Sequence, residues 1–155
     1  QEVLRDFGGI RRYNKVAISV AKNLDTLESG LWGDTLETVN GLGRHSSPVE
    51  ERQAAEFIDD HLHGFGPKQS RNLLQWLGLT RYEIPLDSRI TKWLNEFGFP
   101  VKLSAKALSD RNYYNFVSDG VQALCAQSDI YPCVLDAAIF SSYDRGEWTE
   151  DNLVY

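Results

Sequence analysis

The stretch HGFGPKQS at residues 63–70, followed by IPLDSR at residues 84–89, is the part of this 155-residue chain around which its fold is organised. A Gly-x-Gly turn that ends one helix and begins another presents backbone amides to an anion, and the positive end of the second helix points at the same place. Pro67 suits the first helical position because it has no amide hydrogen, whereas Lys68 opposes the helix dipole there. The sequence therefore predicts a phosphate-binding turn at residues 64–66, beside a lysine whose role is not structural.

The spacing between Lys68 and Asp87 allows the two side chains to meet. A helix that runs from Pro67 to the residue before Gly78 advances roughly 16 Å at about 1.5 Å per residue. Residues 79–86 can then span up to roughly 26 Å at about 3.3 Å each, which is enough to return the carboxylate to the lysine. An amine and a carboxylate beside a bound phosphate are therefore expected.

These residues resemble the helix-hairpin-helix DNA glycosylases of the HhH-GPD superfamily that use a catalytic lysine, and most of all the 8-oxoguanine DNA glycosylase/AP lyases. The resemblance rests on residues 64–68 and on an aspartate nineteen residues after the lysine; it is dense over residues 62–97 and thin elsewhere in residues 4–143. It implies that Lys68 attacks the sugar carbon bearing a damaged base and forms a Schiff base, while Asp87 stabilises the positive charge developing on the sugar. From the residues alone, Lys68 can also be a phosphate contact and Asp87 a plain helix N-cap.

The resemblance also implies that the turn Gly64-Phe65-Gly66 binds a DNA phosphate through its amides, with a monovalent cation on its carbonyls. The alternative is a tight interhelical turn without a ligand. Residues 61–106 carry seven Lys and Arg against three acidic residues, a local balance of +4 within a chain of net charge −6. This basic segment, with Arg71 and Arg89 as further phosphate contacts, predicts a DNA-binding face, although a solvated, salt-bridged surface has the same composition.

Near the carboxyl end, Asp136 and Phe140 are four residues apart and so share a helix face. Their segment resembles the part of the family that reads the extruded base. A carboxylate can accept hydrogen bonds from N1–H and the exocyclic amine of guanine, and an aromatic ring can stack on its face, whereas adenine presents a different edge. The alternative is that Phe140 lies in the core and Asp136 faces solvent. The resemblance also places Arg11 and Arg12 where the family fills the gap left by a flipped base.

No resident metal or redox cofactor is expected. His45, His61 and His63 do not form a metal-binding set, because the last two point to different sides of a helix. Cys125 and Cys133 lack the companions that a zinc or iron–sulfur site needs. The sequence therefore predicts no iron–sulfur cluster, and the two cysteines are interpreted as reduced thiols of an intracellular protein.

The composition, 42% hydrophobic and 25% charged, is that of one globular domain over residues 1–155. No signal peptide and no apolar run of membrane length is visible in the sequence. The chain begins at Gln1 and contains no methionine, so we expect that an amino-terminal part of the protein precedes it.

Helical periodicity runs through the chain and no alternating strand pattern interrupts it. We therefore predict an all-α, helix-hairpin-helix glycosylase fold that lacks some of its amino-terminal helices, with the hairpin at about residues 48–78. Ser47 and Glu50 predict a capping box at the start of the hairpin. A helix over residues 27–39 is expected to be interrupted at Gly30 and Gly33 and to bury Leu31, Trp32, Leu36 and Val39. The other expected helices cover residues 2–7, 13–24, 48–63, 67–77 and 88–97, with further helices beginning at Ser104 or Ser109 and at Pro132.

The function predicted from the sequence is that of an intracellular, monomeric DNA-repair enzyme, a glycosylase with AP lyase activity that removes 8-oxoguanine from double-stranded DNA and has no membrane partner. One alternative is a glycosylase of the same fold for another oxidised base, such as an oxidised pyrimidine. Another is a catalytically silent hairpin module that binds DNA or a protein. A duplex with one lesion separates them, because an enzyme cuts it while a binding module shows only salt-dependent affinity.

Overall fold

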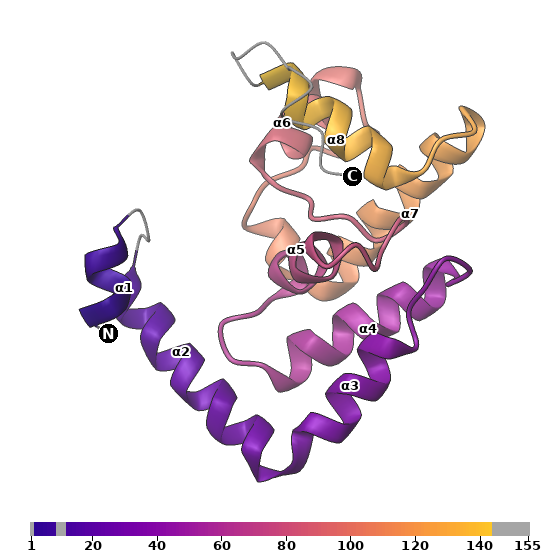
Figure 1. The fold of residues 1–155 in the computed structure, drawn as a ribbon. Coiled ribbons are helices and arrows are strands. Elements are labelled where there is room, and N and C mark those ends of the chain that lie inside the picture. The colour runs from indigo at the N-terminus through magenta and orange to yellow at the C-terminus, as the bar shows by residue number, and fades with distance from the viewer. Residues whose placement is uncertain (1, 9–11, 144–155) are drawn as a thin grey trace, which may run out of the picture.

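The computed structural model describes residues 2–8 and 12–143, and within these ranges the chain forms helices and no strand, which confirms the all-α class (Figure 1). A short π-helical turn, η1, and a short 3-10 turn, η2, join some of the longer elements. The elements are α1 Glu2–Phe7, α2 Tyr13–Thr26, η1 Leu27–Leu31, α3 Trp32–Asn40, α4 Pro48–His61, α5 Pro67–Trp76, α6 Ser88–Phe97, η2 Ala107–Ser109, α7 Arg111–Gln127 and α8 Pro132–Tyr143.

Several helices begin where the sequence predicts, because their capping groups are local. At the start of α4, Glu50 N donates to Ser47 Oγ over 3.3 Å and Ser47 N donates to Glu50 Oε2 over 2.7 Å, so the predicted capping box is confirmed. Helices α5 and α8 begin at proline, as expected. The cap of α7 is Asp110, one residue after the later of its two predicted starts, Ser109, and this aspartate accepts from Tyr113 N.

The turn between α4 and α5 requires glycine at its first position. Gly64 has a φ of +83°, and a Cβ added there would lie 2.9 Å from Ser19 Oγ of α2. Asn23 of α2 forms two hydrogen bonds with the backbone of His63, the residue before Gly64. Its Nδ2 donates to His63 O over 3.0 Å, and its Oδ1 accepts from His63 N over 2.6 Å. The hairpin turn is therefore fixed from outside by α2.

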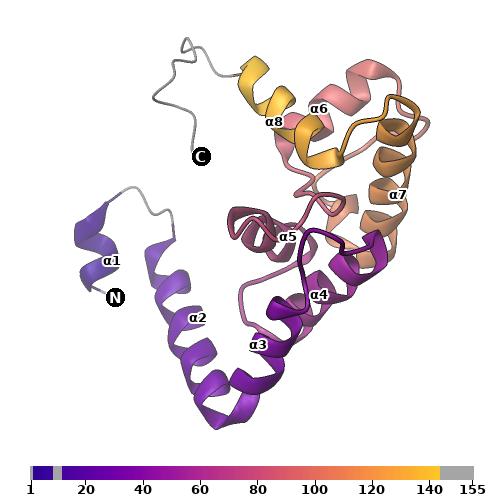
Figure 2. The ribbon, with the colours of Figure 1, turned by 45° about the vertical axis from the view of Figure 1, so that its right-hand side comes forward.

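The buried core falls into two clusters. One lies in the hairpin and the loop before it, and the other joins α6, α7 and α8 to the segment that follows α5. Helix α5 lies between α4 and the α6–α8 group, as Figures 1 and 2 show from two directions. The hairpin cluster contains Leu42, Ala54, Ala55, Ile58 and Leu74, and the second cluster contains Ile84, Leu86, Ile90, Leu94, Leu103, Leu108, Tyr114, Val117, Val121, Cys125 and Ile139.

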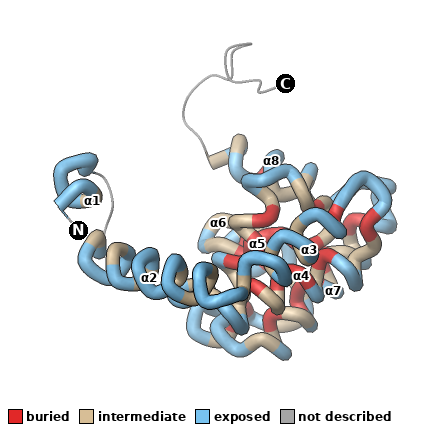
Figure 3. The backbone as a smooth tube through the Cα atoms, turned by 60° about the horizontal axis from the view of Figure 1, so that its bottom comes forward, coloured by how far each residue is buried: buried red, intermediate tan, exposed pale blue. Residues whose placement is uncertain are grey.

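Helices α1, α2 and α3 form an arm with little burial. The chain bends at Gly30, whose φ is +125°, and α2 and α3 diverge from that bend (Figure 2). The expected burial of Trp32 and Leu36 is wrong, since these side chains are 47% and 50% exposed. The expected interruption at Gly33 is also wrong, because α3 runs through it. Figure 3 shows the buried residues gathered away from α1 and α2.

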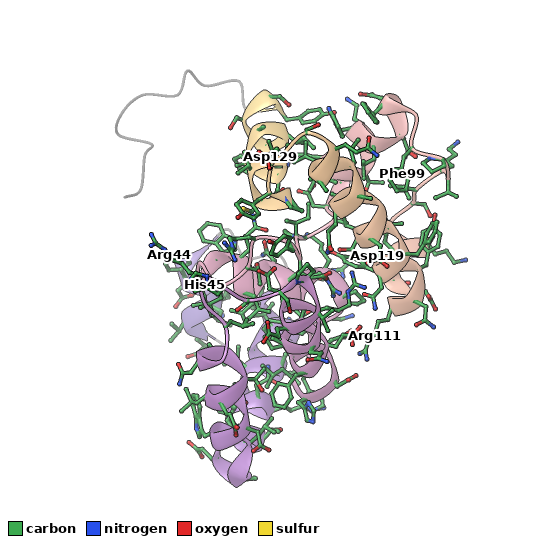
Figure 4. All side chains as sticks on the ribbon, turned by 90° about the vertical axis from the view of Figure 1, so that its right-hand side faces the viewer. Arg44, His45, Phe99, Arg111, Asp119 and Asp129 are labelled. Atoms are coloured by element: carbon green, nitrogen blue, oxygen red, sulfur yellow. The ribbon has the colours of Figure 1, made fainter. Side chains whose placement is uncertain are left out.

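Ion pairs between α4 and α7 join the hairpin to the second cluster. Arg111 of α7 donates to Asp59 over 2.8 Å and to Asp60 over 2.5 Å. Arg52 of α4 donates to Asp119 of α7 over 2.5 Å. Figure 4 labels Arg111 and Asp119 on α7. These contacts fix α7 beside α4, so side chains of α7 can reach the segment between α5 and α6.

Helices α7 and α8 carry the two cysteines as free thiols, Cys125 buried and Cys133 half-buried. Burial raises the pKa of both thiols. Within the described residues no single helix is long and apolar enough to cross a membrane. Helices α7 and α8 reach that length and composition only as a pair, with an angle of 93° between them.

Candidate active site

Lys68 and Asp87 line one cavity of about 770 Å³ between the start of α5, one face of α6 and the η2 turn. Lys68 is half-buried in the first turn of α5, and Asp87 directly precedes α6. The residues between α5 and α6 therefore return the chain to the lysine, as the spacing predicts. Gly66, Lys92, Asn95 and Ser109 also line this cavity.

Asp87 is both a helix cap and part of the cavity wall. Its Oδ1 accepts from Arg89 N over 2.8 Å and from Ile90 N over 3.0 Å, so the plain N-cap role is present. Its Oδ2 lies 3.4 Å from Arg89 Nε, and the side chain is 24% exposed. Oδ1 of Asp87 thus caps helix α6, while Oδ2 faces the Arg89 guanidinium at a longer distance.

The first turn of α5 has the form of an anion site. Its N-cap is Gly66, and in the described part of the chain no side chain caps this turn. The first amides of a helix need acceptors, and without a side-chain cap they are open to an anionic ligand. The Lys68 side chain begins in the same turn, so its amine and these amides belong to one end of α5.

Arg71 does not belong to a DNA-binding surface, which corrects its prediction as a phosphate contact. Its side chain is fully buried, and its Nε donates to the buried Glu83 Oε2 over 2.5 Å. The same guanidinium donates to Asn115 Oδ1 and to Pro67 O, both over 2.9 Å. Helical spacing gives Arg71 the same local pattern as an exposed arginine, and its burial depends on distant partners such as Glu83 and Asn115.

Asp136, Phe140 and Arg89 form a second group beside Asp87. The Arg89 guanidinium carbon lies 4.1 Å from the centre of the Phe140 ring, which remains 44% exposed. Burial raises the pKa of Asp136, and the Asp87 carboxylate acts in the same direction. The base-reading roles of Asp136 and Phe140 stay predictions, and these two residues lie beside the cavity of Lys68 without lining it. Arg89 faces Asp87 and Phe140, and its phosphate contact also stays a prediction.

Gln75 is a site residue that the sequence analysis did not identify. Its Nε2 donates to Asp136 Oδ2 over 2.5 Å, while its Oε1 is buried without a partner in the described structure. Gln75 follows Lys68 by seven residues, so both lie on one face of α5. That spacing was the available signal, and the contact with Asp136 of α8 is what the structure adds to it.

The gap-filling role of Arg11 and Arg12 stays a prediction. Arg11 lies outside the described residues. Arg12 is exposed, has a left-handed φ of 61° and is the N-cap residue of α2. Among the described residues, no group of three or more His, Cys, Asp and Glu side chains is placed to hold a metal ion.

The chain is similar to an 8-oxoguanine DNA glycosylase/AP lyase of Sulfolobus acidocaldarius, to which it is 30% identical over 106 residues. The matched part is 67% of this chain and 46% of that protein, so the chain spans about half the length of the curated relative it matches. No family model matches the chain, and no solved structure matches it significantly.

Proposed function

We propose that the protein is a DNA glycosylase with AP lyase activity that removes 8-oxoguanine from double-stranded DNA inside the cell. The observation that carries this proposal is that Lys68 and Asp87 line the same cavity at the amino end of α5. The similarity to a glycosylase/lyase supports the same chemistry. The resemblance of the hairpin to that family supports DNA as the partner.

In the proposed reaction a DNA phosphate binds at the turn Gly64-Phe65-Gly66, which brings the sugar to Lys68. The neutral amine of Lys68 attacks C1′, and the bond from C1′ to the damaged base breaks, so that the base leaves with its electron pair and takes up a proton. Asp87 stabilises the positive charge on the sugar as that bond breaks. Ring opening and loss of the amine proton give a Schiff base, from which a proton at C2′ and the 3′ phosphate can be eliminated.

The proposed base specificity rests on α8. Asp136 would accept hydrogen bonds from N1–H and the exocyclic amine of guanine, and Phe140 would stack on the base. Gln75 contacts Asp136 from α5, which ties the base-reading carboxylate to the helix that carries Lys68. Asp136→Ala is expected to slow excision of 8-oxoguanine while leaving affinity for an abasic duplex unchanged.

Borohydride trapping on an 8-oxoguanine duplex tests the proposal. The wild-type protein should give a covalent adduct that peptide mapping places on Lys68. Lys68→Gln should abolish trapping with little loss of duplex affinity, because one charge is a small part of the total binding. Lys92→Gln, in the same cavity, is the matched control and should still give an adduct.

Three outcomes would overturn parts of this proposal. An adduct that persists in Lys68→Gln shows that another amine is the nucleophile. Trapping on duplexes with oxidised pyrimidines in place of 8-oxoguanine assigns the same chemistry to a different base. Tight, salt-dependent binding with no adduct on any damaged duplex identifies a hairpin module that only binds DNA.

A further inference from the structure

The segment of residues 79–87, here called the return segment, joins α5 to α6 and ends at Asp87. It contains no helix or strand, and although a few of its backbone groups bond to other backbone groups, such as Asp87 N to Pro85 O over 2.9 Å, side chains from other elements satisfy several more. Glu51 of α4 does this for the first half, because its carboxylate accepts from the amides of Arg81, Tyr82 and Glu83 over 2.9, 2.7 and 2.9 Å. Asp87 therefore depends on distant helices for its position.

Tyr114 of α7 performs the same task for the second half. Its hydroxyl donates to Ile84 O over 2.9 Å and accepts from Leu86 N over 2.7 Å, and the side chain is fully buried. The residue between these two is Pro85, and the residue after them is Asp87. One hydroxyl thus fixes the backbone immediately before the carboxylate that lines the cavity.

Arg71 connects this arrangement to the lysine. Its guanidinium donates to Glu83 of the return segment and to the carbonyl of Pro67, the residue before Lys68. The guanidinium carbon lies 4.5 Å from the centre of the Tyr114 ring. The backbone on either side of the cavity, at residues 67 and 84–86, is therefore bound to one pair of buried, touching side chains.

We propose that Tyr114 is a positioning residue that fixes Asp87 relative to Lys68 through the backbone of Ile84 and Leu86. This inference rests on the proposed glycosylase function. A buried phenylalanine would fill the same space, so packing alone does not require the hydroxyl. The carbonyl of Ile84 and the amide of Leu86 do require it, because each needs a hydrogen-bond partner. A shift of about 1 Å at a reacting group can reduce a rate about 100-fold, so the loss of these two hydrogen bonds should slow the reaction as well as destabilise the fold.

Tyr114→Phe tests the inference because it keeps the ring over Arg71 and removes only the hydroxyl. We expect the single-turnover rate of borohydride trapping, at saturating 8-oxoguanine duplex, to fall about 10- to 100-fold. Affinity for a duplex with an uncleavable abasic analogue should be unchanged, because the hairpin turn and the surface lysines remain. The assay is run well below the unfolding temperature of each variant.

Two control variants separate positioning from stability. Tyr113→Phe removes a hydroxyl from the neighbouring residue of α7 and should trap at the wild-type rate. Ile58→Ala removes buried packing in the hairpin cluster, so it should lower the unfolding temperature while leaving the trapping rate of the folded protein unchanged. A merely structural role for Tyr114 predicts that Tyr114→Phe behaves like Ile58→Ala.

The outcomes distinguish this inference from the function on which it rests. If the wild-type protein gives no adduct, the proposed function fails. If the wild-type protein gives an adduct and folded Tyr114→Phe traps at the same rate, the positioning role is overturned. If Tyr114→Phe does not fold, Gln122→Ala tests the same segment, because the half-buried Gln122 donates to Tyr82 O and Glu83 Oε1. A several-fold slower rate is then expected at unchanged affinity, whereas an unchanged rate shows that contacts from α7 to the return segment do not set the rate and overturns the positioning role.

Discussion

Helices α6 and α2 have the same kind of apolar stripe, yet only one of them is buried. In α6, Ile90 and Leu94 are almost fully buried against α7 and α8. In α2, Val20 and Leu24 lie at the same spacing and are 48% and 49% exposed. The periodicity is a local property that stabilises a helix, whereas burial depends on a second surface, and α6 has one in the described structure.

The polar residues show the same contrast between the two regions. Around the return segment, Arg71 and Glu83 form a fully buried ion pair with further hydrogen bonds to both groups. In α1, Arg5 and Asp6 form an ion pair at 3.0 Å with both side chains exposed. A buried charge that loses its partner is costly, whereas an exposed pair contributes little. The candidate active site therefore lies in the region where substitutions of charged residues should have large effects on stability.

Breaking one ion pair in each region should give the largest difference in unfolding free energy between the two regions. Arg71→Ala removes one of the two arginines that pair with the buried Glu83, removes the hydrogen bonds to Asn115 and Pro67 and leaves a cavity, so we expect the free energy of unfolding to fall by about 3–5 kcal/mol. Arg5→Ala should change it by less than about 0.5 kcal/mol. Chemical denaturation measures both, and a small effect of Arg71→Ala would mean that Arg52 alone compensates the Glu83 charge.

Removing one leucine from each region gives the second test. Leu74→Ala opens a cavity in the hairpin cluster and should cost about 2–5 kcal/mol of unfolding free energy. Leu24→Ala, in α2, should cost less than about 1 kcal/mol because the side chain is half exposed. Equal costs in the two variants would show that another surface covers α2 in solution.

DNA affinity should separate the surface lysines of the two regions. Lys92→Ala should weaken binding equally for intact and damaged duplex, and should reduce the slope of log affinity against log salt by about 0.9, the value for one phosphate contact. Lys22→Ala, on α2, is the matched control and should leave both quantities unchanged. Equal losses in the two variants would place the DNA-binding face across the arm as well.

The smallest effect concerns pH and Asp136. Burial raises its pKa in the folded protein, so the folded state binds this proton more tightly than the unfolded state does. The ionised group therefore costs stability at neutral pH, and this cost disappears as pH falls toward about 4, the ordinary value for aspartate. Asp136→Asn should raise the unfolding temperature at pH 7 by about 1–2 °C, with a smaller gain at lower pH. An equal gain at all pH values would contradict this assignment.

Much of the fold could be predicted because its signals are short. The capping box at Ser47, the proline starts of α5 and α8, and the cap at Asp87 each involve residues within about four positions. The sequence also showed that Asp87 can return to Lys68, because residues 79–86 are long enough to span the length of α5, and the structure places both residues on one cavity.

Other features could not be predicted because they join residues far apart in the chain. The burial of Arg71 depends on Glu83 and Asn115, and the exposure of Trp32 depends on which helices pack beside α3. The hydrogen bond from Gln75 to Asp136 spans 61 residues. Helical spacing offers several residues on each face and does not say which of them meets a partner.

The sequence by itself determined the helices, the glycine turn and the spacing that lets Lys68 and Asp87 meet. Only the tertiary structure decided that Tyr114, Arg71 and Glu51 fix the return segment. The physical reason is the distance along the sequence between hydrogen-bond partners. Caps and turns bond to near neighbours, whereas a segment without secondary structure bonds to the helices that surround it in the fold.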